Sequence, residues 1–360
     1  MEVEELLEVV KASFEVRDFI LTENGINFDL EPEPEEVIKR KFADLAKKLI
    51  PQGVIPKLLR GEDDRPLLLL RNMPEAALRS RRSSKKQVIL LVITIFTVAI
   101  SGHLLASGTA SLLARIGIKV DIVQGTILYA LGLMSILGVH ESGHIASNIK
   151  WGGEIELPYF IPFIPPYGTL GALITSRKIP INRDEFFDLG ISGPVAGFIV
   201  AIVVSFAGVL TSHVIPPTVA AQWEKSGEVA ALPIPVLVHI FEYALGLASK
   251  GMLLLSPLAV AGIIGLIVTF LNLLPASQLD GGHVIYSLVR DAKKRTVVGW
   301  LAALLTLPVS PMMALIVIFL MAMVPHPPPL DEYTGVSKRR KVLGSILYLV
   351  LMALCLPLPS

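Results

Sequence analysis

Two histidines and one glutamate are closely spaced in an apolar stretch, in the order His140-Glu141-Ser142-Gly143-His144. On a helix, residues four apart lie on the same face, so both imidazoles can bind one metal ion. Glu141 lies between them, where its carboxylate can take a proton from water and later return it. The spacing is typical of a hydrolytic zinc site, with His140 and His144 as metal ligands and Glu141 as the general base.

The surroundings of this motif strengthen the interpretation, because a five-residue pattern also arises by chance. An ionisable side chain inside a membrane helix costs about 3 kcal/mol or more unless it is paired or ligated. The alternative is that His140, Glu141 and His144 are hydrated side chains at a helix end. Three such residues within one helical turn favour the metal site.

A catalytic zinc ion usually has three protein ligands and an open fourth position. Residues 251–279 carry no charge, and Asp280 follows them directly. Pro275 interrupts a helix just before it, and Gly281 lets the backbone approach closely. We therefore predict Asp280 as the third zinc ligand. Its alternative role, as the N-cap of the helix that follows, is compatible with this.

The elements that must position these residues have the composition of a membrane protein. Of the 360 residues, 52% are hydrophobic and 18% are charged, and the mean hydropathy is +0.64. A soluble domain carries about 25% charged residues. More than half of the charged residues lie in the first 86 positions. This distribution predicts a polytopic α-helical membrane protein with a small water-soluble head.

A membrane-spanning helix needs about 20 apolar residues. About six apolar runs in the sequence approach or exceed this length. We predict spans at residues 87–107, 124–149, 189–211, 252–274, 297–324 and 342–356, the last being short. Residues 233–249 are apolar but contain Glu242, and we expect them at the membrane surface. Residues 156–180 are apolar and rich in proline, which excludes a straight helix and predicts a re-entrant hairpin in the membrane.

The head is predicted to be a small α+β domain. Residues 12–21 and 26–32 alternate apolar and polar side chains around an Asn-Gly turn, which is a strong hairpin signal. Residues 31–50 predict an amphipathic helix with acidic residues early and basic residues late. Residues 54–60 and 65–72 predict a second hairpin. We expect the helix to pack on the sheet, and the head to be structural or regulatory.

We divide the chain into the head (residues 1–78), a basic juxtamembrane linker (79–86) and a transmembrane domain (87–360). The basic linker places the head on the cytoplasmic side of a cell membrane. Counting spans from there puts the candidate active site on the same side. The basic residues 338–341 then fall on the opposite side, so either the C-terminal helix is half-inserted or one span is miscounted.

The net charge argues against one class of partner, and the cysteine content excludes disulfides and thiolate metal clusters. The formal net charge of +1 gives no indication of a nucleic-acid partner, because phosphate binding needs clustered basic residues. Cys355 is the only cysteine, so an internal disulfide or a thiolate metal cluster is impossible.

Two motifs together resemble the site-2 protease family of intramembrane zinc metalloproteases, and more closely its archaeal and plastid branch with an N-terminal soluble domain. These motifs are His-Glu-Ser-Gly-His and the pattern that begins at Asn272 and ends in Asp280-Gly281. Supporting matches are Gly168-Thr169-Leu170-Gly171, Ser192-Gly193-Pro194-Val195-Ala196-Gly197 and His326-Pro327-Pro328-Pro329-Leu330-Asp331, so that the resemblance covers residues 87–331.

The resemblance implies that Zn2+ is bound by His140, His144 and Asp280, and that Glu141 activates water. It further implies substrate binding by Asn272 and by Gly168, Thr169 and Gly171. The proline-rich segment is then a membrane-embedded β-hairpin whose free edge can pair with an unwound substrate strand. The family's PDZ insertion is not evident, because residues 214–250 are too short for one.

The leading hypothesis is zinc-dependent hydrolysis of a peptide bond within or near a transmembrane helix, as in regulated intramembrane proteolysis. The expected partners are the lipid bilayer and a transmembrane protein or peptide substrate. One alternative is a metal or solute transporter that uses the same His/His/Asp site, although no inverted repeat is evident. Another is an inactive scaffold, against which the intact ligands and base argue.

Overall fold

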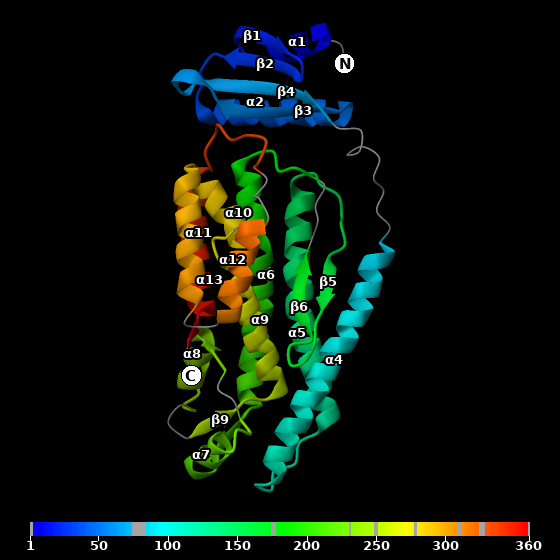
Figure 1. The fold of residues 1–360 in the computed structure, drawn as a ribbon, viewed down its shortest axis with the longest axis vertical. Helices are drawn as coiled ribbons and strands as arrows, with labels where there is room; N and C mark the ends of the chain where they lie inside the picture. Colours follow the sequence, from blue (N-terminus) through cyan, green and yellow to red (C-terminus); the bar gives the residue numbers. More distant parts are fainter. Residues whose placement is uncertain are drawn as a thin grey trace.

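The computed structural model describes residues 3–73, 84–173, 178–229, 232–247, 251–276, 279–307, 311–323 and 328–358. The head lies over one end of a group of helices, and strand β3 and helix α2 of the head face that end (Figure 1). Part of the predicted basic linker and the start of the His326–Asp331 motif lie outside the described residues.

The described part of the head, residues 3–73, contains two helices, two short 3-10 turns and one four-stranded antiparallel sheet. Its elements are α1 (Val3–Lys11), β1 (Val16–Thr22), β2 (Gly25–Leu30), α2 (Glu35–Leu49), η1 (Ile50–Gln52), β3 (Val54–Arg60), η2 (Glu62–Asp64) and β4 (Pro66–Asn72). The sheet order is β1-β2-β4-β3. Both predicted hairpins are therefore present, and the β2–β4 pairing joins them into one sheet.

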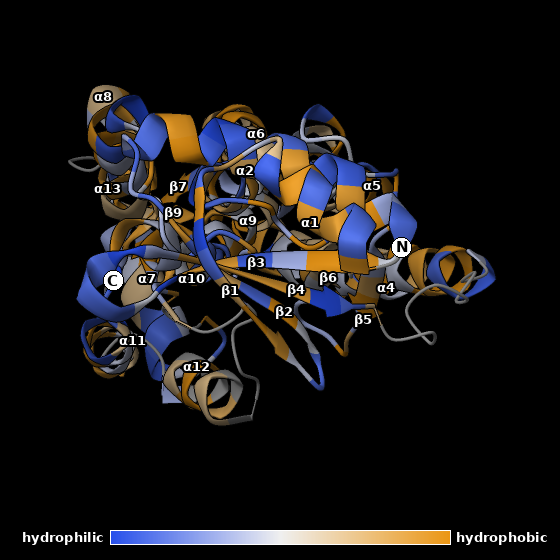
Figure 2. Ribbon diagram, turned by 90° about the horizontal axis from the view of Figure 1, so that it is seen from above, coloured by the Kyte–Doolittle hydropathy of each residue, from blue (hydrophilic) through white to orange (hydrophobic). Residues whose placement is uncertain are grey.

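The head core follows from the sequence pattern of its strands and helix. Alternate residues of β2, β3 and β4 are buried, among them Phe28, Leu58 and Leu68, because successive side chains of a strand point to opposite faces. They pack with the apolar stripe of α2, including Phe42 and Leu45. Seen from above, both head helices carry hydrophilic and hydrophobic residues (Figure 2). The predicted packing of helix on sheet is confirmed.

The rest of the chain is a helical membrane protein that crosses the membrane several times. Among the described residues, three helices are long and apolar enough to cross a membrane: α4 (Lys85–Ala114), α5 (Ile122–Lys150) and α6 (Arg183–Leu210). They correspond to the first three predicted spans. The fourth apolar run contains the short strand β9 (Met252–Leu254) and the shorter apolar helix α9 (Pro257–Leu273).

The predicted single span at residues 297–324 is wrong. This run is divided into α11 (Ala292–Thr306) and α12 (Pro311–Met323), which pack against each other. Pro311 begins the second helix, the position at which a missing N–H costs least. The last predicted span is a π-helical turn (Arg340–Gly344) followed by the 11-residue helix α13 (Ser345–Cys355).

The division into α11 and α12 also corrects the position of the basic residues 338–341. Counting six spans put them on the side opposite the head. In the structure Arg340 instead binds Asp188, in the second turn of α6, close to the head. Splitting one apolar run into two helices adds one reversal of the chain, which returns these residues to the head end of the helices.

The proline-rich segment contains the antiparallel hairpin of β5 (Tyr159–Pro162) and β6 (Thr169–Leu173). Strand β5 packs along α4, and the hairpin lies between α4 and α5 (Figure 1). The predicted hairpin is therefore present in this segment.

The remaining elements are short. They are β7 (His213–Ile215), α7 (Pro217–Lys225), β8 (Ile234–Pro235), α8 (Val236–Ala244), α10 (Asp280–Leu288) and β10 (Pro357–Leu358). Strand β7 pairs with β9, and α7 and β9 lie at the end farthest from the head (Figure 1). Helices α5, α6 and α9 contact one another and form the centre of the bundle, with fully buried Leu133, Ala201 and Leu266 between them. This centre positions the candidate site.

Candidate metal centre

His140 and His144 lie one turn apart near the end of α5, as their spacing predicts. Both are buried, with 3% and 8% of their surface exposed. Their Nε2 atoms lie 3.1 Å apart. Two imidazole nitrogens at this distance repel each other if both present lone pairs, so the arrangement suits a shared proton or cation between them.

Asp280 joins the two histidines from the first residue of α10. Its Oδ2 atom lies 3.2 Å from His140 Nε2 and 3.3 Å from His144 Nε2. All three candidate ligand atoms lie within 4.8 Å of one another. The N-cap of α10 is Leu279, so the alternative prediction of Asp280 as that cap is wrong. The carboxylate lies beside the imidazoles instead.

A backbone carbonyl of α6 fixes the orientation of the His144 ring. Leu189 O lies 2.9 Å from His144 Nδ1, so Nδ1–H donates to this carbonyl. The other nitrogen, Nε2, then carries the lone pair and is directed at Asp280, as a metal-binding histidine requires. Sequence reasoning missed Leu189, because every residue type has a backbone carbonyl and the sequence does not show which one makes this contact.

Glycines of α6 bring this helix close to both imidazoles. A Cβ at Gly193 would lie 2.1 Å from His144 Nε2, and one at Gly197 would lie 2.9 Å from His140 Cβ. The two glycines are four residues apart and therefore share one helix face. Their role in packing was not predicted, although a small-xxx-small pattern in an apolar helix is a recognised signal for close helix contact.

Glu141 is buried beside the ligands, with 5% of its surface exposed. Its carboxylate interacts electrostatically with His144, His140 and Asp280. An acid and three potential metal ligands therefore share one enclosed region between α5, α6 and α10. This arrangement can hold a cation and accept a proton next to it.

The predicted substrate-binding residues divide into two groups. Asn272, in the last turn of α9, lies in the site, with Nδ2 3.3 Å from His140 Nε2. Gly168 and Thr169 contact other parts of the molecule. The carbonyl of Gly168 accepts a hydrogen bond from Thr97 of α4 (2.7 Å), and the Thr169 hydroxyl donates to Ile161 O across the hairpin (2.9 Å).

Gly171, the fourth predicted substrate-binding residue, lies within β6 at a φ of +101°. Its N–H donates to the Thr169 hydroxyl, 3.0 Å away. Like Gly168 and Thr169, it therefore has its contacts within the hairpin and not with the three candidate ligands.

The donor set fits zinc. Two imidazole nitrogens and one carboxylate oxygen are the ligand types of catalytic zinc sites, which leave one position open. The hydrogen bond to Leu189 O directs the His144 nitrogen toward the other two donors. The carboxylate opposite the imidazoles supplies the negative charge that a divalent cation needs.

The sequence profile of Peptidase family M50 matches residues 128–317, which include all three candidate ligands and Glu141. This match covers more than half of the chain. The chain therefore belongs to Peptidase family M50.

Similar proteins are known from plants. The chain is 25% identical over 354 residues to a probable chloroplastic zinc metalloprotease, EGY2, of Oryza sativa subsp. indica, covering 94% of this chain and 62% of that protein. It is 26% identical over 254 residues to the probable chloroplastic zinc metalloprotease EGY1 of Arabidopsis thaliana, covering 65% and 43%. The chain thus spans less than two thirds of the length of these relatives.

Among solved structures, the site-2 protease from Methanocaldococcus jannaschii is 20% identical. The superposition covers 66% of this chain and 85% of that chain, with a TM-score of 0.30.

Proposed function

We propose that this chain is an intramembrane zinc metalloprotease that hydrolyses a peptide bond within or near a transmembrane helix of a membrane-protein substrate. One observation carries the proposal: His140 and His144 of α5 meet Asp280 of α10, a helix far away in the sequence, beside the buried Glu141. Membership of Peptidase family M50 supports it.

His140, His144 and Asp280 would hold the zinc ion. When bound, zinc supplies a Lewis acid that lowers the pKa of water and polarises a peptide carbonyl. Glu141 accepts the proton of the attacking water and delivers it to the departing amine. The low exposure of these residues excludes bulk water and strengthens the electrostatic interactions among them.

Substrate handling would involve α9 and the hairpin. The side-chain amide of Asn272 lies next to His140, where it can donate to the carbonyl oxygen of the scissile bond. The two-stranded β5–β6 sheet leaves strand edges to which an extended peptide could add by main-chain hydrogen bonds. Gly168, Thr169 and Gly171 would shape this strand. Unwinding is necessary because a helical peptide bond is shielded from attack.

We further propose that residues 1–78 form a regulatory or structural head, that residues 79–86 form a juxtamembrane linker and that residues 87–360 form the protease domain. The chain would lie in the cell membrane with the head and the active site toward the cytoplasm. Support comes from the basic residues Lys150, Arg290 and Arg340, which lie at the head end of the helices.

A test uses the full chain in liposomes with a set of fluorescently labelled single-span transmembrane peptides. The wild type should contain one zinc per chain and cleave members of the set. Glu141→Gln should keep the zinc and lose cleavage, whereas Glu154→Gln, at an exposed position of the segment after α5, should retain both. Cleavage by Glu141→Gln at the wild-type rate would overturn the mechanism, and zinc flux across the liposomes without cleavage would favour a transporter.

A further inference from the structure

The head is joined to the protease domain by a short segment, residues 330–337, which we call the docking segment. It lies alongside β3, the edge strand of the head sheet. The N–H of Leu58 donates to Leu330 O (2.8 Å), and the N–H of Glu332 donates to Leu58 O (2.9 Å). The docking segment thus extends the head sheet, with Asp331 opposite Leu58 in a parallel bridge.

The other side of the docking segment binds the residues that lead into α6. The N–H of Leu330 donates to Pro180 O (2.9 Å), and the next N–H donates to Ile181 O (2.8 Å). Ile181 and Leu330 also belong to the apolar core of the head. The docking segment therefore connects the head sheet to the start of α6 through main-chain hydrogen bonds.

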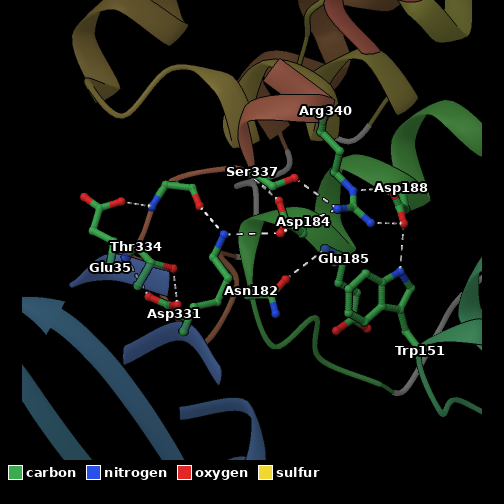
Figure 3. Close-up of polar contacts among 12 residues, drawn as sticks. Glu35, Trp151, Asn182, Asp184, Glu185, Asp188, Asp331, Thr334, Ser337 and Arg340 are labelled. Carbon is green, nitrogen blue, oxygen red and sulfur yellow. Dashed lines mark hydrogen bonds and ion pairs between the residues drawn. The ribbon is translucent and has the colours of Figure 1, made fainter. Parts of the chain in front are cut away.

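Helix α2 of the head reinforces this connection with a buried ion pair. Lys39 Nζ lies 2.6 Å from Gly335 O and 3.2 Å from Asp184 Oδ2, and the Lys39 and Asp184 side chains are only 11% and 9% exposed. Glu35 accepts the N–H of Gly335 (3.0 Å), and Asp184 accepts the N–H of Ser337 (2.7 Å). Figure 3 labels Glu35 of the head, Ser337 of the docking segment and Asp184 in the first turn of α6.

Asp188, one turn further along α6, receives the second set of contacts. Arg340 binds it through two nitrogens, with Nε 2.7 Å from Oδ1 and Nη2 2.9 Å from Oδ2. Lys150 and Trp151, at the end of α5, also donate to Oδ2, at 2.8 Å and 3.2 Å. Asp188 thereby ties α6 to the end of α5 and to the C-terminal segment (Figure 3).

The next residue along α6 is Leu189, whose carbonyl receives the His144 Nδ1–H at 2.9 Å. We propose that Arg340 and Lys39 are positioning residues of the metal centre. They fix the first two turns of α6 so that the Leu189 carbonyl meets His144, and docking of the head thereby sets the metal affinity of the site. The effect on turnover rests on the proposed function, whereas the effect on metal affinity does not.

The magnitude of the effect follows from how histidine ligands behave. Loss of the hydrogen-bonding partner of a ligating histidine typically costs about 10- to 100-fold in metal affinity or activity. Lys150 and Trp151 still hold Asp188 when Arg340 is removed, so α6 would shift and not detach. The variants are therefore expected to remain folded with a misplaced His144.

The experiment measures zinc affinity by chelator competition and the absorption spectrum of the Co2+-substituted full chain in detergent. Arg340→Ala and Lys39→Met should weaken zinc binding about 10- to 100-fold and alter the Co2+ spectrum, and Arg340→Lys should restore part of the affinity. Two matched controls should behave like the wild type. These are Arg339→Ala, at the exposed neighbouring position, and Lys41→Met, whose ion pair is with Glu33 inside the head.

Cleavage kinetics and amide exchange complete the test. A positioning role lowers kcat and leaves KM unchanged, and hydrogen exchange at Leu58 and Glu332 reports whether the head has separated. Wild-type affinity and an unchanged Co2+ spectrum in Arg340→Ala and Lys39→Met would overturn the proposal, as would equal losses in the two controls. If Arg340→Ala does not fold, the zinc affinity of Lys39→Met alone tests the proposal. A wild type that binds zinc but cleaves no peptide would contradict the proposed function and leave the affinity test intact.

Discussion

Gly193 of α6 lies directly against the His144 ring, where a Cβ would be 2.1 Å from Nε2. Because protein interiors are close-packed, an added methyl group at this contact between helices must displace the imidazole or separate α6 from α5. We expect Gly193→Ala to lower bound zinc and abolish cleavage, although alanine favours a helix over glycine by about 1 kcal/mol. Metal content per chain, measured by mass spectrometry of the purified protein, tests this.

The control for this variant is Gly138→Ala on α5. A Cβ at Gly138 would have no neighbour within 4 Å among the described residues. This variant should keep its zinc and be at least as stable as the wild type. Full zinc content in Gly193→Ala would show that close contact with α6 does not hold His144 in place.

The candidate site could be predicted in part from the sequence, for a physical reason. The shared face of His140 and His144 is a local property of helix periodicity, and Asp280 stands out as the first charge after a long uncharged run. Leu189 could not be predicted, because it contributes a carbonyl that any residue type supplies. Gly193 carries a pattern of close helix contact, but the pattern does not name the partner helix.

The fold was predictable to a similar extent. Both head hairpins and α2 follow from alternation, turn residues and amphipathic periodicity. The boundary between α11 and α12 was missed, although Pro308 and Pro311 within this apolar run are a signal that one helix ends and another begins. The docking of residues 330–337 on β3 was also missed. It is a pairing between distant segments through main-chain atoms, and nothing local in either segment specifies it.

Asp280→Asn tests the third ligand without changing the size of the side chain. The amide oxygen is a weaker zinc ligand than the carboxylate, so we expect zinc affinity to fall by more than the roughly 100-fold seen when only a partner of a ligand is lost. Chelator competition measures the change. Asp291→Asn is the matched control. Asp291 caps α11 by accepting from two backbone N–H groups, and asparagine caps as well as aspartate. Equal affinities in the two variants would exclude Asp280 as a ligand.

The docking of the head should depend on pH through Glu35. Partial burial raises the pKa of this carboxyl, but hydrogen bonds from Arg290 and from the Gly335 N–H outweigh it and hold the pKa below its ordinary value of 4.5. The docked head therefore favours ionised Glu35. This contribution to docking is complete above pH 4.5 and is lost as the pH falls through the lowered pKa.

Asp331 contributes with the opposite sign, because burial raises its pKa despite hydrogen bonds from Thr334. The two contributions are separated by comparing the wild type with Glu35→Gln. Hydrogen exchange at Leu58 and Glu332 measures docking in each. The wild type should be more protected than Glu35→Gln at neutral pH, and the difference should disappear below the lowered pKa of Glu35. A difference that stays constant through this acidic range would contradict the prediction.

Gly168 holds the hairpin against α4, and its substitution tests the role of the hairpin in substrate handling. Its φ is +78°, and a Cβ would lie 2.7 Å from Val98 Cα. Gly168→Ala should displace β6 and lower kcat/KM for transmembrane peptides by about 10- to 100-fold, because small misplacements of positioning groups have effects of this size. Zinc content should not change. Gly171→Ala shares the strain of a positive φ, at +101°, but its Cβ would meet nothing within 4 Å among the described residues. Equal losses in both variants would contradict a specific role for the contact between Gly168 and α4.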